Sequence, residues 1–321
     1  KKFKRKLPLN QNSKKIKDIY IKIERINRAK KKIDKGKTKT TETSCLMNEI
    51  LQETSFKTHK NRVFPIYDKY MFFNTKKANA VLDCGVSLWF HLKEHKITLE
   101  QKLKLAEMYT CKDRFCPFCN WRRQMKYSKM IYNHISTLEA TKKLRYIFLT
   151  LTIKNCGIED LRATIDHMQK SFNEMTRTKQ WKNSILGYLR VLEFTKEKNR
   201  AGYMHPHFHI LLAVEPSYFD TKQNKYLKKD DFAKMWQSAL KVDYEPVVDV
   251  RIIKKNKDKN ANAAVVAEIC KYPLKDTDLS KLTWQEFEIL VLQLKNVRNI
   301  NAGGLLKGIL KPIANIDDDL I

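Results

Sequence analysis

Two histidines set two positions apart are the most chemically informative residues of this sequence. They lie in the stretch MHPHFHILLAV, which holds three of the eight histidines of the chain and then becomes apolar. On a β-strand, side chains two apart share a face, so His207 and His209 point the same way with Cα atoms roughly 7 Å apart. Two imidazoles at this spacing can hold one divalent ion and leave coordination sites open. His205 precedes Pro206, which donates no ladder bond, and is the weakest candidate.

A third ligand is expected from a neighbouring strand. Glu193, in RVLEFT, is the only acidic residue of an apolar segment, so its carboxylate needs a cation or several hydrogen bonds to offset desolvation. The alternative is a carboxylate at a strand end that faces water or pairs with Arg190. Mixed histidine and carboxylate ligation suits Mg²⁺ or Mn²⁺ when phosphate oxygens supply the remaining positions.

The stretch AEICKYPLK could carry a nucleophile. On a helix, Glu268 and Tyr272 would share one face within about 6 Å, while Lys271 and Lys275 flank the tyrosine in sequence. A tyrosine can attack phosphorus when a cation favours its ionisation, and a carboxylate one turn away could activate water or a hydroxyl for a second transfer. The same spacing is more often found on a solvated helix face.

A cysteine cluster predicts a structural metal site. In CKDRFCPFCNWRR, Cys111, Cys116 and Cys119 have a spacing close to that of zinc knuckles. Cys84, in LDCG, is the best fourth ligand because Gly85 permits the tight turn that metal loops need. The other candidates for this position are His91 and His95. Chance packing of free thiols is the alternative to a Zn²⁺ site.

The charge of the chain favours a polyanionic partner. The 321 residues include 64 Lys/Arg and 35 Asp/Glu, a net charge of +29 with a pI of about 9.7. The first forty residues hold 17 Lys/Arg and 3 Asp/Glu, so about half of the excess lies in a tail that could simply aid solubility. The remainder predicts a basic face on the folded body, and Arg114, Arg122 and Arg123 around the cysteines would face nucleic-acid phosphates.

The elements that must position these residues alternate between helix and strand. Strands are predicted at 144–155, 185–195, 207–214 and 246–255, and helices at 121–139, 157–179, 228–241 and 260–272. Segment 98–109 looks more helical than extended. This order describes an α+β domain whose largely antiparallel sheet has one face covered by helices. No apolar run approaches the ~20 residues of a membrane span, so we expect a cytosolic chain with reduced thiols.

Several motifs together resemble a known family. FLTLT, HPHFHILLAV and AEICKYPLK, in that order, are similar to the three motifs of HUH endonucleases, most closely the rolling-circle replication initiators of small Gram-positive bacterial plasmids. CKDRFCPFCNWRR and KMWQSALKVDYEPVVDVRIIK resemble that family too. The likeness covers roughly residues 81–311, and the basic arm before about residue 60 lies outside it.

The resemblance implies a mechanism and a fold. Tyr272 would nick one strand of the plasmid's double-strand origin at a hairpin, stay linked to the 5′ end and leave a 3′-OH for synthesis. His207 and His209 would hold the Mg²⁺ or Mn²⁺, and Glu268 would activate water to end a round. The implied fold is a five-stranded antiparallel sheet with the HUH strand at its centre, and the motif with Thr150 and Thr152 is mostly structural.

The resemblance also implies a division of the chain and a set of partners. We expect a basic arm at 1–60 that is disordered or partly helical, a zinc-binding and DNA-contacting segment at 61–140, a nuclease core at 141–280 and a helical extension at 281–321. The partners would be single-stranded or hairpin origin DNA, a host helicase and the replication machinery, with a dimer left open. The rival readings are a conjugative relaxase or transposase, and a zinc-dependent DNA-binding regulator without catalysis.

Overall fold

The computed structural model describes residues 59–86, 88–94, 101–197, 199–223, 225–253 and 279–310; for 88–94, 101–107 and 221 it describes the backbone only. The chain divides into two compact units, Lys1–Glu53 with Glu94–Lys102, and Thr54–Lys93 with Leu103–Ile321, and nearly all described residues belong to the latter. The predicted helix at 260–272, most of the basic arm, and the candidates Glu268, Lys271, Tyr272 and Lys275 lie outside the described residues.

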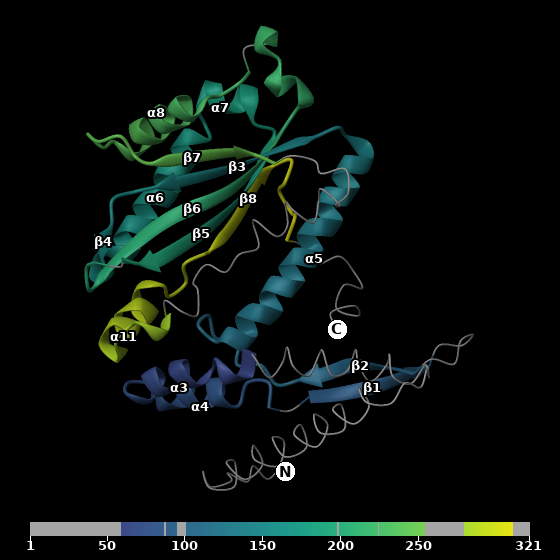
Figure 1. The fold of residues 1–321 in the computed structure, drawn as a ribbon, viewed down its shortest axis with the longest axis vertical. Coiled ribbons are helices and arrows are strands. Elements are labelled where there is room, and N and C mark those ends of the chain that lie inside the picture. The colour runs from purple at the N-terminus through teal and green to yellow at the C-terminus, as the bar shows by residue number, and fades with distance from the viewer. Residues whose placement is uncertain are drawn as a thin grey trace, which may run out of the picture. The chain divides into compact units, whose positions relative to one another are not determined.

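An antiparallel sheet forms the centre of the larger unit (Figure 1). Its strands run in the order β7-β3-β6-β5-β8, and the short strand β4 pairs with β6 beyond the end of β3. Their bounds are β3 Arg145–Thr152, β4 Cys156–Gly157, β5 Gly187–Lys196, β6 Tyr203–Val214, β7 Val248–Ile252 and β8 Ile300–Gly304. The predicted antiparallel sheet is confirmed, with the histidine strand in the middle and with β4 as an additional strand.

Both faces of this sheet are covered, which corrects the expectation of one covered face. On one face, Phe208, Ile210 and Leu212 of β6 belong to a core that includes residues of α6 (Leu161–Met175) and α8 (Lys229–Leu240). On the other face, Leu211 and Ala213 pack in a second cluster with Ile131 and Ile135 of α5 (Pro117–Thr141). The same strand therefore presents two histidines and then buries the rest of that face.

The remaining helices and strands frame this sheet and the cysteines. They are α3 Phe64–Met71, α4 Thr75–Leu82, β1 Leu88–Glu94, β2 Gln101–Met108, the 3₁₀ turns η1 Ile158–Asp160, η2 Pro216–Phe219 and η3 Thr221–Gln223, α7 Lys179–Ser184 and α11 Trp284–Gln293. The predicted helix at 121–139 lies inside α5, which begins earlier because Pro117 suits the first turn of a helix. In the described ranges, no helix is long and apolar enough to cross a bilayer.

The expectation of helix at 98–109 is wrong, because β2 occupies this segment and pairs with β1 in a two-stranded sheet. Lysine, leucine and glutamate favour helices by intrinsic propensity. The sequence KLKL, however, alternates polar and apolar residues with the period of a strand. Here the alternation decides the structure, and the propensities do not.

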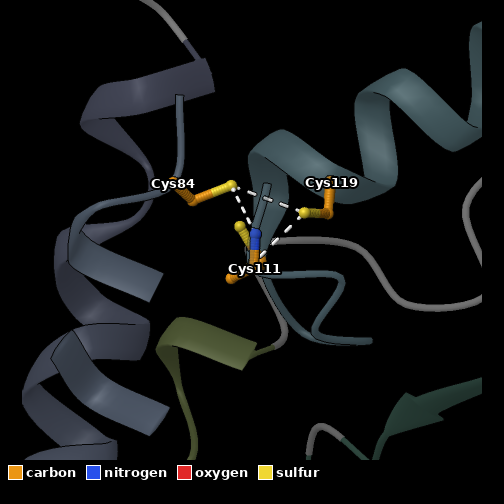
Figure 2. Close-up of side chains that lie close together, drawn as sticks. Cys84, Cys111 and Cys119 are labelled. Atoms are coloured by element: carbon orange, nitrogen blue, oxygen red, sulfur yellow. Dashed lines mark hydrogen bonds between the residues drawn. The ribbon is translucent and has the colours of Figure 1, made fainter. Parts of the chain in front are cut away.

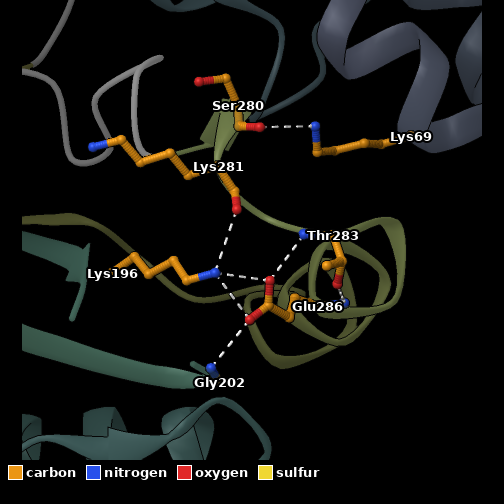
Figure 3. Close-up of polar contacts among 7 residues, drawn as sticks. All are labelled: Lys69, Lys196, Gly202, Ser280, Lys281, Thr283 and Glu286. Carbon is orange, nitrogen blue, oxygen red and sulfur yellow. Dashed lines mark hydrogen bonds and ion pairs between the residues drawn. The ribbon is translucent and has the colours of Figure 1, made fainter. Parts of the chain in front are cut away.

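A polar cluster ties the start of α11 to the end of β5 (Figure 3). One carboxylate serves three donors: Glu286 accepts from the backbone N–H of Thr283 at 2.8 Å and of Gly202 at 3.1 Å, and it pairs with Lys196 Nζ at 3.0 Å. Lys196 also donates to the carbonyl of Lys281 at 3.3 Å. The cluster therefore holds residues 281–286 against β5, the strand that carries Glu193. These residues come shortly after segment 254–278, which lies outside the described residues.

Candidate active site and cysteine cluster

The pairing of β5 with β6 brings Glu193 to the two histidines. Its register sets Glu193 directly opposite His207, and His209 follows on the same face of β6. Glu193 Oε2 lies 2.8 Å from Nε2 of His209 and 3.6 Å from Nε2 of His207. One ligand atom of each residue lies within 4.8 Å of the others. The three residues selected from the sequence thus converge on one point.

The carboxylate of Glu193 is buried and ionised. Only 5% of Glu193 and 8% of His207 is exposed. Burial acts to raise the pKa of Glu193, but the imidazoles of His207 and His209 beside the carboxylate outweigh it and lower this pKa to about 2. Arg190 does not pair with Glu193, because its guanidinium packs over the rings of Phe208 and Phe172, at 4.3 and 4.8 Å, on the opposite face of the sheet.

This donor set fits a divalent cation. Two imidazole nitrogens and one carboxylate oxygen face a common point, and His209 keeps 22% of its side chain exposed, which gives access from solvent. Such mixed ligation leaves positions for phosphate oxygens, as Mg²⁺ and Mn²⁺ sites require. His205 does not join the group, since its Nδ1 lies 2.5 Å from Oδ1 of Asn155.

The four cysteines also meet, and Figure 2 shows three of them, Cys84, Cys111 and Cys119. Cys84 Sγ lies 3.4 Å and Cys111 Sγ 3.6 Å from Cys119 Sγ, and all four sulfurs, with that of Cys116, lie within 4.8 Å of one another. A tetrahedral Zn²⁺ with bonds of about 2.3 Å would set its sulfurs about 3.8 Å apart. The four sulfurs fit this ion. The side chain of His91 and all of His95 lie outside what the structure describes.

Three separate elements deliver these sulfurs. Cys84 lies in the turn after α4, Cys111 follows β2, and Cys116 and Cys119 stand at the start of α5. Gly85 has a φ of +69°, and a Cβ there would lie 2.6 Å from the ring of Phe118. The glycine of LDCG is therefore required both by its backbone conformation and by a close approach.

The thiols of the cluster compete for protons. Hydrogen bonds from neighbouring thiols, Cys111 first, lower the pKa of Cys119, and the same kind of contact raises the pKa of Cys116. Close thiolates repel one another, so the group can ionise fully only around a cation. All five cysteines of the described segments are free thiols.

The three arginines near the cysteines that were predicted to contact phosphates lie in different surroundings. Arg114 donates from both terminal nitrogens to the carbonyls of Leu294 and Val297, at the end of α11. Arg122 and Arg123 lie in the first turns of α5, partly exposed, and Arg123 donates to Oδ1 of Asn120 at 2.6 Å. Arg114 thus has donors committed inside the protein, whereas Arg122 and Arg123 lie on α5, the helix that begins at the cluster.

Sequence reasoning missed the residues around the histidine rings. Thr150 Oγ1 lies 3.2 Å from Nδ1 of His209, and the ring of Phe148 stacks on that imidazole at 5.3 Å. Both belong to FLTLT, where every second residue shares a face of the strand. The alternation in FLTLT indicates which of its residues share a face of the strand. Which of the two faces meets the histidines depends on the register between β3 and β6, and the sequence does not give this register.

Comparisons with known proteins agree with the sequence motifs. A family model described as "Replication protein" matches residues 102–320. Proteins named "Protein rep" are 37% identical in Lactiplantibacillus plantarum (82% of this chain, 85% of the relative), 35% in Lentilactobacillus hilgardii (79% and 84%) and 36% in Streptococcus pneumoniae serotype 2 (79% and 78%). No solved structure gives a significant match. The chain therefore belongs to the replication protein family, that of the plasmid rolling-circle replication initiators.

Proposed function

We propose that this initiator nicks one strand of the double-strand origin of its plasmid as an HUH endonuclease. The observation that carries the proposal is the convergence of Glu193 Oε2 with Nε2 of His207 and His209 on the middle strand of the sheet. The three residues would hold Mg²⁺ or Mn²⁺. Such an ion, when bound, withdraws charge from the oxygens of the scissile phosphate.

The strand transfer is assigned to Tyr272. Its phenolic oxygen gives up a proton to solvent and forms a bond to phosphorus, while the bond from phosphorus to the 3′ oxygen breaks. The 3′ oxygen takes a proton and becomes the primer end, and the 5′ phosphate stays on the tyrosine. Lys271 and Lys275 flank this residue in sequence and would favour the phenolate by their charge.

Termination is assigned to Glu268. Its carboxylate would accept a proton from water, or from a 3′-hydroxyl, as that oxygen attacks the phosphotyrosine, and the tyrosine leaves with a proton. A helical spacing of four residues between Glu268 and Tyr272 supports this pairing. One carboxylate would thus replace the second tyrosine that two-tyrosine relatives use.

The cysteine cluster is proposed to hold a structural Zn²⁺ through Cys84, Cys111, Cys116 and Cys119. The ion would fix the start of α5, and thereby direct Arg122 and Arg123 to the phosphates of single-stranded or hairpin origin DNA. In the proposed division, 61–140 forms this element, 141–280 the nuclease core, 1–60 a basic arm and 281–321 an extension. A host helicase, the replication machinery and a dimeric state complete the proposal, in the bacterial cytoplasm.

The deciding experiment compares wild type with Tyr272→Phe on end-labelled single-stranded origin DNA with Mn²⁺, analysed on a denaturing gel. Wild type should give a downstream fragment linked to protein through its 5′ end and an upstream fragment with a free 3′-OH, whereas Tyr272→Phe should bind equally but leave the strand intact. Nicking by the variant would remove Tyr272 from its role. Binding by wild type without cleavage would favour the DNA-binding regulator instead.

A further inference from the structure

The strand beside the histidines has two chemically different faces. Leu149 and Leu151 of β3 are fully buried in the core. The alternate residues Phe148, Thr150 and Thr152 share the histidine face, and the register sets Thr150 opposite His209 and Thr152 opposite His207. The polar positions of FLTLT therefore stand beside the candidate metal site, and the apolar positions anchor the strand.

His207 is held by the main chain. Its Nδ1 lies 3.2 Å from the carbonyl oxygen of His205, which can only accept a hydrogen bond. Nδ1 must then carry a hydrogen, so in the neutral ring Nε2 keeps its lone pair. That atom is 3.6 Å from Glu193, beyond hydrogen-bond distance, so His207 already presents the tautomer that a metal needs.

His209 is held by side chains. Its Nε2 is 2.8 Å from the carboxylate of Glu193, a distance at which Nε2 carries a hydrogen and donates it. Its Nδ1 is 3.2 Å from the hydroxyl of Thr150. A metal bound at Nε2 displaces that hydrogen, so the neutral ring must then carry its hydrogen on Nδ1.

A hydroxyl can hydrogen-bond to Nδ1 of His209 in both tautomers of the ring. The Thr150 hydroxyl can donate to Nδ1 while Nε2 is protonated, and it can accept from Nδ1 once Nε2 is a ligand. Neither state leaves a ring nitrogen without a partner, and Phe148 keeps the ring plane in place by stacking at an interplanar angle of 27°. Thr152 has another role, because its hydroxyl donates to the carbonyl of Val247 at 2.9 Å.

We propose that Thr150 is a positioning residue of the metal site, whose hydroxyl holds His209 with Nε2 towards the ion and follows its change of tautomer. The inference rests on the proposed metal site. Residues that hydrogen-bond to a metal ligand commonly affect the affinity for the metal. FLTLT is then more than a structural strand, since one of its two threonines belongs to the metal centre.

The test is Mn²⁺ affinity of the full chain without DNA, measured from the electron paramagnetic resonance signal of free Mn²⁺. Thr150→Val removes the hydroxyl at nearly constant shape and should weaken binding by about 10–100-fold. Thr150→Ser restores the hydroxyl and should bind nearly as wild type does. Thr152→Val is the matched control on the same face of the same strand, and it should keep the wild-type affinity.

The outcomes separate this inference from the proposed function. Wild-type affinity in Thr150→Val, or equal weakening in Thr150→Ser and Thr150→Val, would overturn the role of the hydroxyl. Failure of wild type to bind Mn²⁺, or binding unchanged by Glu193→Gln, would contradict the metal site itself. A second readout needs no variant at position 150: ¹⁵N spectra of histidine-labelled wild type with Mg²⁺ should show His209 protonated at Nδ1, and protonation at Nε2 would contradict ligation by His209 and thus the metal site itself.

Discussion

At the residue scale, the candidate metal site could be predicted in part from the sequence. His207 and His209 follow from strand periodicity alone, and Glu193 stood out as a single acid among apolar neighbours. The contribution of Thr150 could not be foreseen, because it requires the register that sets Thr150 opposite His209. Arg114 shows the same limit: its neighbours in sequence suggest phosphate binding, but its donors reach carbonyls at the end of α11, 180 residues or more away in sequence.

Two glycines give a matched test of the cysteine cluster. Gly85 and Gly202 have φ angles of +69° and +70°, but only Gly85 meets another residue, Phe118, where a Cβ would be. Gly202→Ala should cost on the order of 1–2 kcal/mol from backbone conformation alone. Gly85→Ala should cost more, and it should release the Zn²⁺ proposed for this cluster faster to a chelator. If both variants lose the same free energy of unfolding relative to wild type, the contact with Phe118 does not contribute to stability.

At the element scale, alternation and periodicity identified the parts of the sheet best. The predicted strands and helices of the core contain or overlap β3, α6, β5, β6, α8 and β7. Among the strands that were not identified, β2 has residues of high helix propensity, and β8, with the sequence INAGG, has too few β-branched residues to signal a strand. Both are defined by their partner strands, so local sequence could not reveal them.

The attachment of α11 to β5 should depend on pH. Burial acts to raise the pKa of Glu286, but hydrogen bonds from Thr283 and Lys196 lower it below its ordinary value of 4.5. The ionised carboxylate therefore stabilises the fold above pH 4.5, and this contribution is lost as the pH falls through the lower, folded-state pKa. Glu286→Gln should be less stable than wild type at neutral pH, and the difference should shrink in acid.

Urea unfolding of both proteins across this pH range measures the effect. Glu288→Gln, on the same helix, is the control and should differ little from wild type at any pH. If the free energies of unfolding of wild type and Glu286→Gln differ by the same amount down to well below pH 4.5, the charge of Glu286 does not stabilise the fold. The difference would then come from altered hydrogen-bond geometry alone.

At the scale of the whole molecule, the charge of +29 dominates its expected behaviour. Binding to origin DNA should weaken as salt rises, with a slope of about 0.7–0.9 log units in affinity per log unit of salt for each phosphate contacted. Arg122→Ala combined with Arg123→Ala should reduce that slope by about one for each contact removed. Fluorescence anisotropy over a salt series measures this. Lys179→Ala on α7 serves as a control, and an unchanged slope in the double variant would remove α5 from the interface.

The position of β8 has a consequence for how the chain is made. β8 (Ile300–Gly304) completes the sheet by pairing with β5 (Gly187–Lys196), although β7, at the opposite edge, ends at Ile252. During synthesis from the N-terminus, β5 therefore remains an open edge until β8 has left the ribosome. An unpaired edge can recruit strands from other chains. A nascent chain interrupted between residues 253 and 299 should consequently be more prone to aggregate than the finished protein.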